Sequence, residues 1–485
     1  MSATIFEKSQ PGHRAFAAPD HGPSRPARIA PAKRRASPVG LPEMSELEIL
    51  RHYVSLSRLN HSIAQGFYPL GSCTMKYNPV MNELLAGLPG FAACHPRQDP
   101  ATVQGCLELM WRLEEALKAI TGMSAFTLQP AAGAQGEYVG MSIARQYFAD
   151  RGESRDLVLI PDSAHGTNPA SVAMAGLKSR SIASGADGLV HLAALEENLN
   201  EKVAVFMVTN PNTLGLFEAD ILAIAQRVHA AGALLYMDGA NMNALVGRVR
   251  PGDIGFDIMH LNLHKTFSTP HGGGGPGSGP VGVVPALADY LPGLRIHNAG
   301  GRFSPSAAPR AVGDVHSQHG NFAMLLRAYA YILRLGRDGL KDVSAGAVLN
   351  ANYLQARLAD VLEIPHAGPC MHEFVGSGRA LKAQGLRTLD VAKRLLDFGV
   401  HAPTIYFPLI VPEALMIEPT ETESKATLDR FAAILRQVFE EARTDPETLH
   451  TAPHDTPVGR LDEVRAAKEL RLIQPRSAET EGAPL

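Results

Sequence analysis

A lysine that follows a mostly apolar segment carries the most reactive chemistry of the chain. Lys265 comes just after residues 256–261 and just before the glycine-rich stretch 272–277. A lysine at the end of a buried strand can form an imine with an aldehyde cofactor, and burial favours the neutral amine that attacks. An isolated lysine is usually a surface residue. The adjacent glycines favour the reactive role, because they let the backbone approach a ligand closely.

A carboxylate follows a second apolar segment. Asp238 comes directly after residues 234–237 and lies 27 residues before Lys265, which leaves room for one crossover and the next strand. A pyridine-based aldehyde cofactor, pyridoxal phosphate, accepts electrons while its ring nitrogen is protonated, and an adjacent carboxylate holds that proton. An aspartate in this position is more often a helix cap or a turn residue. Paired with Lys265, it is predicted to face the ring nitrogen.

A run of small residues supplies candidates for binding the cofactor phosphate. Residues 131–137 open a helical pattern that continues through Gln146. The free backbone N–H groups of Gly133, Ala134 and Gln135 at such a helix start could hold a dianion. A simple turn from a loop into a helix would have the same composition. The pattern differs from a Walker-type phosphate loop.

A histidine follows a further apolar segment. His165 comes shortly after residues 157–160, where an imidazole could stack on the cofactor ring and exchange protons with a substrate. The alternative is a histidine that only bonds a neighbouring carbonyl. His264, beside the lysine, and Asn212, after the apolar run 203–208, complete the predicted cofactor contacts.

The elements that must position these residues alternate along the chain. From about Thr121, short β-branched runs alternate with helical periodicity, which is typical of a parallel sheet covered by helices. The predicted strands are Leu157–Ile160, Val203–Val208 and Leu234–Met237, and the predicted helix Ile221–Val228 ends at Gly232. Ligands of such α/β sheets gather at the carboxyl ends of the strands. The candidate residues lie at those ends.

The sequence divides into four segments. A helical pattern at 323–335 predicts a connection into a second domain. We predict an N-terminal arm and helix at 1–60, a large cofactor-binding domain at 61–335, a small domain at 336–450 and an extended tail at 451–485. Up to about Gly40 the chain is rich in Pro, Ala and Arg, which indicates a flexible arm that docks on another subunit, or alternatively a transit peptide.

Composition favours a small ligand. The chain has 485 residues, 45% of them hydrophobic, and a net charge of −3 that gives no global attraction to nucleic acid or to an anionic membrane. Four cysteines show no metal-ligand spacing and are too sparse for a disulfide framework, so we expect no metal and a reducing cytoplasm: Cys73, Cys94, Cys106 and Cys370. We predict no membrane span and no secretory signal.

Several long segments resemble the P-protein of the glycine cleavage system: 67–79, 164–171, 237–244, 263–277 and 415–424. The beginning at Ile5–Ser9 and the length resemble subunit 2 of the bacterial two-subunit form. The resemblance implies an α/β protein of fold type I, the PLP-dependent transferase-like class, with a large parallel-sheet domain and a smaller C-terminal α+β domain. It also implies the roles given above to Lys265, Asp238 and His165.

The resemblance further implies an activity and partners. The chain would decarboxylate glycine, release CO2 and transfer the aminomethyl group to the lipoyl disulfide of H-protein. It would assemble with P-protein subunit 1, two copies of each. Ser72 and Thr74 are our candidates for holding glycine. Residues 310–321 are only loosely similar to the family, and we assign them no catalytic role.

Two other hypotheses remain open from the sequence. Another enzyme of the same fold class, such as an amino-acid C-acyltransferase or a sulfur-transferring lyase, would share Lys265 and Asp238. A non-catalytic scaffold subunit would only bind the complex, although the retention of both residues and of the glycine loop argues against it.

Overall fold

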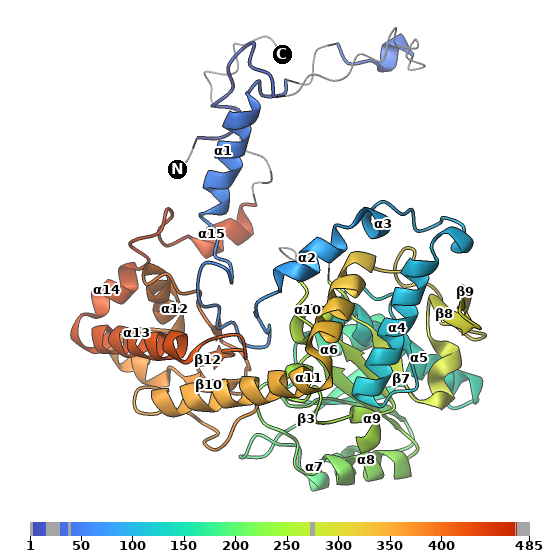
Figure 1. Ribbon diagram of the computed structural model, residues 1–485. Coiled ribbons are helices and arrows are strands. Elements are labelled where there is room, and N and C mark those ends of the chain that lie inside the picture. The colour runs from blue at the N-terminus through green and yellow to red at the C-terminus, as the bar shows by residue number, and fades with distance from the viewer. Residues whose placement is uncertain (1–2, 16–29, 37–39, 272–276, 471, 473–485) are drawn as a thin grey trace.

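A seven-stranded sheet forms the centre of the larger part of the molecule (Figure 1). The computed structural model describes residues 3–15, 30–36, 40–271, 277–470 and 472. The strand order is β1-β7-β6-β5-β4-β2-β3, with β2 to β6 parallel and β7 antiparallel to both of its neighbours. The strands are β1 Ala125–Thr127, β2 Leu157–Pro161, β3 Lys178–Ile182, β4 Val203–Thr209, β5 Leu234–Gly239, β6 Ile258–Leu261 and β7 Val281–Val283.

The central strands are apolar because helices cover both of their faces. In β4, Val205 and Met207 belong to the core on one face, whereas Phe206 and Val208 belong to the core on the other. The core with Val205 and Met207 includes residues of α5 Gly133–Asp150 and α6 Thr167–Met174. The core with Phe206 and Val208 includes residues of α4 Gln104–Thr121, α7 Leu192–Asn198 and α8 Ile221–Ala230. Because β2 to β6 are parallel, their carboxyl ends all lie at one edge of the sheet.

The predicted elements of this sheet are confirmed. All three predicted strands occur, each one or two residues longer than predicted. The predicted helix occurs as α8, and Gly232 follows its C-cap with φ of +74°, the left-handed conformation that glycine tolerates best. The glycine-rich stretch 272–276 lies outside the described residues.

One long helix leads from the sheet into the C-terminal part of the chain. Helix α11 spans Phe322–Leu358 and is interrupted at Gly336, whose φ of +60° and ψ of −168° are not helical. The interruption falls where the sequence predicts a domain boundary, and the division into domains remains our proposal. Beyond it, an antiparallel sheet of order β10-β12-β11 packs with helices around a separate core that includes Phe374, Leu415 and Phe431.

The elements of this C-terminal part are β10 Phe374–Ser377, β11 Thr404–Ile405, β12 Ala414–Ile417, α12 Thr388–Asp397, α13 Lys425–Thr444, α14 Pro446–Thr451 and α15 Glu463–Lys468. The remaining elements are α1 Glu46–Ser57, α2 Val80–Ala86, α3 Pro89–Ala92, α9 Pro251–Ile254, α10 Leu263–Thr266 and the hairpin of β8 Leu294–Ala299 with β9 Arg302–Ala307.

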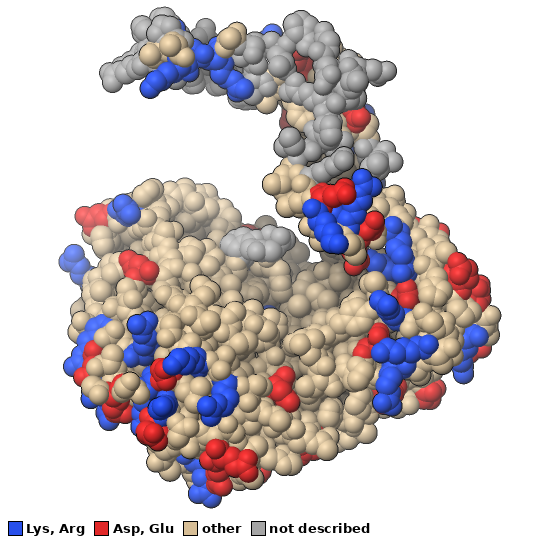
Figure 2. Space-filling model, turned by 180° about the vertical axis from the view of Figure 1, so that it is seen from behind, with Lys and Arg blue, Asp and Glu red and all other residues tan. Residues whose placement is uncertain are grey.

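Helix α1 stands away from the main body (Figure 1). Ser45 and Glu48 form a capping box at its start, and Glu48 also lies 3.2 Å from His13 of the N-terminal segment. On the opposite face of the molecule, Figure 2 shows positive and negative side chains interspersed. Within the described ranges, no helix is long and apolar enough to cross a membrane.

Candidate active site

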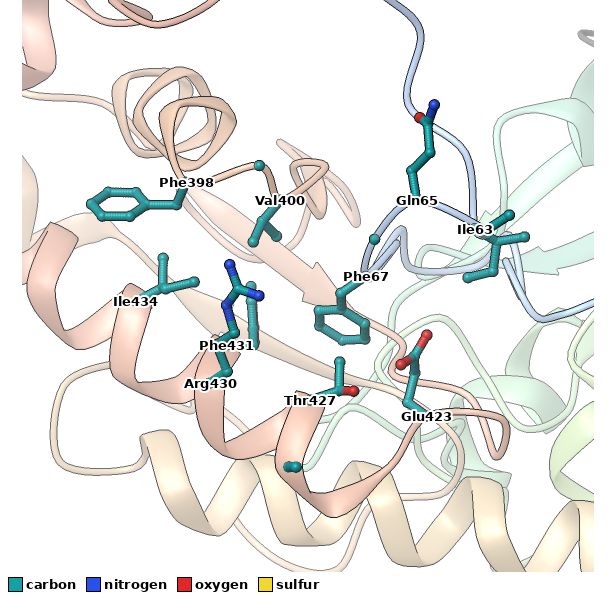
Figure 3. A pocket seen from close by; sticks show the side chains of 14 residues that line it. Ile63, Gln65, Phe67, Phe398, Val400, Glu423, Thr427, Arg430, Phe431 and Ile434 are labelled. Carbon is teal, nitrogen blue, oxygen red and sulfur yellow. The ribbon is translucent and has the colours of Figure 1, made fainter. Parts of the chain in front are cut away.

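A cavity of about 230 Å³ opens at the carboxyl ends of β4, β5 and β6, beside the start of α5. The structure brings seven of the ten predicted site residues to its walls: Ser72, Gly133, Ala134, His165, Asp238, His264 and Lys265. Gln135, Asn212 and Thr74 lie outside the walls. A larger hollow of about 650 Å³ lies between α13 and residues 63–67 (Figure 3), and it contains none of the predicted residues.

Lys265 reaches the cavity from a single-turn helix directly after β6. Helix α10 begins after Asn262, and the Lys265 N–H donates to the Asn262 carbonyl at 3.0 Å. The side chain is half-buried, less enclosed than the sequence predicted. Among the residues that the structure describes, none forms a hydrogen bond or ion pair with its Nζ. The amine is therefore available for covalent chemistry.

Asp238 lies at the end of β5 with both carboxylate oxygens occupied. Oδ1 forms an ion pair with His260 Nε2 at 3.2 Å and accepts from the Ala240 N–H at 2.9 Å, and Asn168 Nδ2 donates to Oδ2 at 3.1 Å. Burial alone would raise the pKa of Asp238, but the His260 charge and these hydrogen bonds hold it well below its usual range. The cavity therefore contains a fixed negative charge.

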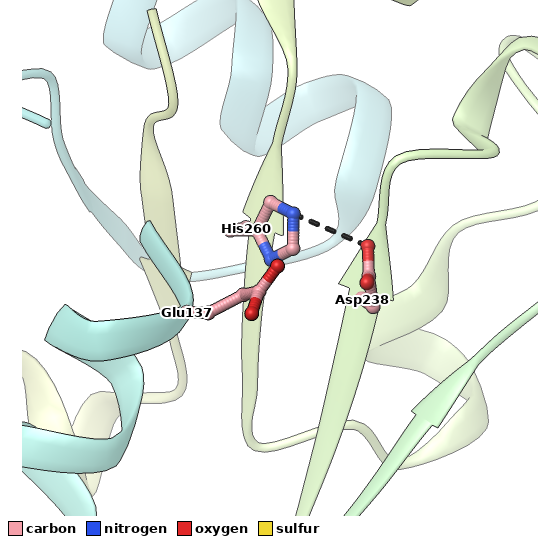
Figure 4. Close-up of side chains that lie close together, drawn as sticks. All are labelled: Glu137, Asp238 and His260. Carbon is pink, nitrogen blue, oxygen red and sulfur yellow. Dashed lines mark ion pairs between the residues drawn. The ribbon is translucent and has the colours of Figure 1, made fainter. Parts of the chain in front are cut away.

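His260 is a site residue that sequence reasoning missed. It lies in β6 opposite Asp238 (Figure 4), and Tyr236 places its hydroxyl 2.7 Å from His260 Nδ1. Burial would lower the pKa of His260, yet the charge of Asp238 raises it above its usual value. The sequence contained an indication, because a histidine inside an otherwise apolar strand, two residues before Asn262, is unusual.

The start of α5 forms a cradle for an anion. The N–H groups of Gly133 and Ala134 precede the first bond of the helix, from the Gly136 N–H to the Ala132 carbonyl. A Cβ at Gly133 would lie 2.3 Å from Asn262 Oδ1, so a larger residue there would displace the Asn262 side chain.

Two buried polar atoms at this end of the cavity, Thr209 Oγ1 and Asn262 Oδ1, have no hydrogen-bond partner within the described ranges. Free N–H groups together with unsatisfied polar atoms fit a phosphorylated ligand.

Gln135 supports the cradle instead of lining it. Its Oε1 accepts from the Ala131 N–H at 2.7 Å, and its Nε2 donates to the Val315 carbonyl at 2.6 Å. Asn321 Nδ2 donates to the Gly277 carbonyl at 2.6 Å. Residues 310–321, to which we assign no catalytic role, are thus bound directly to the loops around the cavity.

His165 lies at the mouth of the cavity, exposed to solvent, in front of α6. Its Nδ1 accepts from the Thr167 N–H at 3.2 Å, and the Thr167 hydroxyl donates to Glu137 Oε1 at 2.7 Å. The ring of Phe407 meets the imidazole edge-on with the centroids 5.5 Å apart. These contacts orient His165 toward the cavity, and no role was predicted from the sequence for Thr167 or Glu137.

His264 lines the cavity, whereas Asn212 lies outside its walls. Burial, with the charges of His271 and Lys265, lowers the pKa of His264 to about 3, so this wall of the cavity carries a neutral imidazole. Asn212 organises its own loop: its Oδ1 accepts from the N–H groups of Leu214 and Leu216, and its Nδ2 donates to the Gly188 carbonyl.

Ser72 and Thr74 belong to a strained turn. Both have positive φ, +59° and +49°, which is uncommon for residues with a side chain. Ser72 lines the cavity, whereas Thr74 is buried beneath it. The Ser72 N–H donates to Glu373 Oε2 at 2.6 Å, and the Thr74 hydroxyl donates to Glu418 Oε1 at 2.6 Å. Glu373 and Glu418 were not predicted from the sequence.

Two groups of buried side chains place their ligand atoms within 4.8 Å of one another, a spacing that could hold a metal ion: Glu137, Asp238 and His260 (Figure 4), and His372, Glu373 and Glu418. In both groups the carboxylates also accept hydrogen bonds or form ion pairs within the protein. The groups at the cavity match the needs of pyridoxal phosphate: a lysine amine, a carboxylate for the ring nitrogen and N–H groups for the phosphate.

The sheet and this site define a fold-type-I enzyme that uses pyridoxal phosphate. The model for class-V aminotransferases matches residues 137–275, and the model for the C-terminal domain of glycine dehydrogenase matches residues 343–455. The chain belongs to the family of glycine dehydrogenase (decarboxylating) subunit 2. The resemblance seen in the sequence, the predicted fold class and the predicted cofactor are confirmed.

The similarity extends over nearly the whole chain. Proteins called "Probable glycine dehydrogenase (decarboxylating) subunit 2" are 57% identical in Thermotoga petrophila and 56% identical in Pseudothermotoga lettingae, each over 96% of this chain and 98% of the relative. A crystal structure of glycine decarboxylase (P-protein) of the glycine cleavage system, in inhibitor-bound form, matches with a TM-score of 0.72 at 22% identity, covering 84% of this chain and 93% of that one. This structural match shows the shared fold.

Proposed function

We propose that the chain is the cofactor-bearing subunit of a glycine decarboxylase. It decarboxylates glycine with pyridoxal phosphate and transfers the aminomethyl group to the lipoyl disulfide of H-protein, with release of CO2. One observation carries the proposal: the cavity of this family member contains a free lysine, Lys265, and a fixed carboxylate, Asp238, at the ends of adjacent elements.

Each part of the cavity has a task in this reaction. When bound, pyridoxal phosphate withdraws electrons from the Cα–carboxylate bond of glycine. Lys265 supplies the amine that holds the cofactor, and Asp238 keeps a proton on the ring nitrogen. The N–H groups of Gly133 and Ala134 bind the phosphate, and Ser72 orients glycine. His165, held by Thr167, is placed at the entrance to exchange a proton with the substrate.

The chain acts with partner proteins. The relatives are subunits of a two-subunit enzyme, so we propose a partner subunit 1, with two copies of each subunit in the assembly, and a cytoplasmic location. Helix α1 presents an apolar stripe to solvent, with Leu47, Leu50 and Val54 exposed by 52%, 58% and 42%. Residues at this spacing share one helix face, and a stripe of this kind favours docking to another chain. Lipoylated H-protein is the proposed second partner.

The test is exchange of labelled bicarbonate into the carboxyl group of glycine. The chain is mixed with candidate subunit 1 and lipoylated H-protein, and exchange is expected only when all three proteins and pyridoxal phosphate are present. An amino-acid C-acyltransferase or a sulfur-transferring lyase of the same fold would bind the cofactor without exchanging bicarbonate. Such a result would contradict the proposal.

A further inference from the structure

Two glutamates lie together beneath the cavity. Glu373, directly before β10, and Glu418, directly after β12, are both fully buried. Their carboxylate oxygens lie within 4.8 Å of each other. Like charges this close in a buried site disfavour double ionisation, because each carboxylate raises the free energy of the other.

Within the described part of the chain, the hydrogen bonds to this pair of carboxylates come from one turn. Ser72 donates its N–H to Glu373 Oε2 at 2.6 Å and its hydroxyl to Oε1 at 3.3 Å. Thr74 donates its N–H to Glu418 Oε2 at 2.8 Å and its hydroxyl to Oε1 at 2.6 Å. The pair thereby connects the small C-terminal sheet to the positive-φ turn at the cavity wall.

The surrounding charges can balance one negative charge but not two. Among the described residues, the charge of Lys265 acts on both carboxyls, and Glu421 adds a negative charge near Glu418 that its ion pair with Lys76 at 2.7 Å offsets. Burial lowers the pKa of His372 to about 3, and burial raises the pKa of both Cys73 and Cys370, so these neighbours stay neutral. A second ionised carboxylate would therefore be uncompensated.

The contacts place the remaining proton on Glu373. Its bond from the Ser72 hydroxyl is the longest of the four, so Oε1 is the oxygen least committed as an acceptor. His372 Nε2, buried and without a hydrogen-bond partner in the described part of the chain, lies 3.7 Å from the same atom. In the tautomer with the ring proton on Nδ1, Nε2 is a free acceptor that a protonated Oε1 would face. In agreement, burial and the charge of Glu418 raise the pKa of Glu373 well above its usual value. Burial also raises the pKa of Glu418, but to a smaller extent, because the Thr74 hydrogen bonds and the charge of Lys265 lower it.

We propose that Glu373 and Glu418 act as one carboxyl pair that retains a single proton at neutral pH, on Glu373, and thereby positions Ser72 in the glycine site. The two are positioning residues, since they reach the substrate only through the Ser72–Thr74 turn. The assignment of the turn to glycine binding rests on the proposed function, whereas the shared proton does not.

Infrared difference spectroscopy of the full-length protein tests the shared proton directly. At pH 7, subtracting the spectrum of Glu373→Gln from that of the wild type should leave a carboxylic-acid C=O band. Glu418→Gln should also abolish this band, because Glu373 then ionises beside Lys265. A matched control is Glu114→Gln, which removes a buried glutamate paired with Arg295 at 2.6 Å and should leave a carboxylate band only.

Thermal unfolding provides a second measurement. A carboxyl whose folded pKa is raised stabilises the fold below its unfolded pKa, and this contribution is lost as pH rises through the folded pKa. Between pH 5 and pH 9 the Tm of the wild type should therefore fall more than the Tm of Glu373→Gln. A wild-type spectrum in which Glu373 contributes only a carboxylate band at pH 7, or equal pH dependence of Tm in both proteins, would overturn the proposal. Neither measurement depends on glycine turnover, so a failed exchange assay leaves this test intact.

Discussion

Asp238 and His260 are register partners on the adjacent parallel strands β5 and β6, and an ion pair of 3.2 Å joins Oδ1 of one to Nε2 of the other. Tyr236 holds the second ring nitrogen of His260 at 2.7 Å. The imidazole therefore stays fixed against the carboxylate, and the charge of Asp238 is maintained in a fully enclosed part of the cavity wall.

Replacement of Asp238 by Asn should leave cofactor binding intact but lower turnover by on the order of 10²-fold, because a neutral amide cannot hold the proton of the ring nitrogen. The same change should lower the pKa of His260, which loses its anionic partner, as measured by NMR of the ring protons. Asp253→Asn, at an exposed position, is the control. Unchanged turnover and an unchanged His260 pKa would show that Asp238 has neither role.

Replacement of Lys265 by Ala should remove the covalent link to the cofactor and abolish bicarbonate exchange. The fold should survive, because the half-buried side chain makes no described polar contact. Borohydride reduction of the holoprotein followed by peptide mass spectrometry should label Lys265 in the wild type. Lys341→Ala, a partly exposed lysine on α11, should keep the label. A label on any other lysine would contradict the assignment.

Lys76 anchors the segment that carries Ser72 and Thr74. It is fully buried, forms an ion pair with Glu421 at 2.7 Å and donates to Asn243 at 2.8 Å. Lys76→Met should cost about 3–5 kcal/mol in the free energy of unfolding, since it leaves the mostly buried carboxylate of Glu421 without its cationic partner. The double variant with Glu421→Gln should recover part of this loss.

The control for Lys76 is the exposed pair Lys425–Asp429, in which Lys425→Met should lower the free energy of unfolding far less, because solvent screens the two charges. Urea titration of each variant measures the difference. Equal costs at the two positions would show that burial of the Lys76 pair contributes nothing.

His372 should make the fold sensitive to acid. Burial lowers its pKa to about 3, and neither ring nitrogen has a partner within the described ranges. A histidine with a depressed folded pKa contributes stability above its unfolded pKa, near 6.5, and this contribution is lost as pH falls toward the folded value. From pH 6.5 to pH 5 the loss should approach about 2 kcal/mol.

His372→Phe should flatten this part of the stability curve, as followed by urea unfolding at each pH. His297→Gln, at an exposed position, should behave as the wild type. If His372→Phe lost as much stability between pH 6.5 and pH 5 as the wild type does, groups other than His372 would cause the acid sensitivity.

Assembly should depend on the N-terminal segment. Leu50→Asp on the apolar stripe of α1, or deletion of residues 1–40, should weaken association with subunit 1 before it weakens cofactor binding. Light scattering of the mixed subunits measures association, and absorbance of the bound cofactor measures its retention. An obligate interface of this kind should bury about 2,000 Å² or more. A fully active chain that stays free of its partner at micromolar concentration would contradict the prediction.

The sequence by itself determined the elements and the residues at their ends. Lys265, Asp238 and Gly133 follow strands or open a helix, and their type and position along the chain were enough to find them, because a strand end and a helix start are local features. The predicted helix ending at Gly232 is equally local, since it depends on backbone conformation within a few residues.

Only the tertiary structure decided which distant residues meet. Glu373 and Glu418 reach Ser72 and Thr74 across 301 and 344 residues of chain, and His260 meets Asp238 through strand register. Such contacts depend on how two sheets and a connecting helix pack, so no local periodicity reports them. The same packing left Asn212 and Gln135 outside the cavity walls, because their amides are used to hold neighbouring loops.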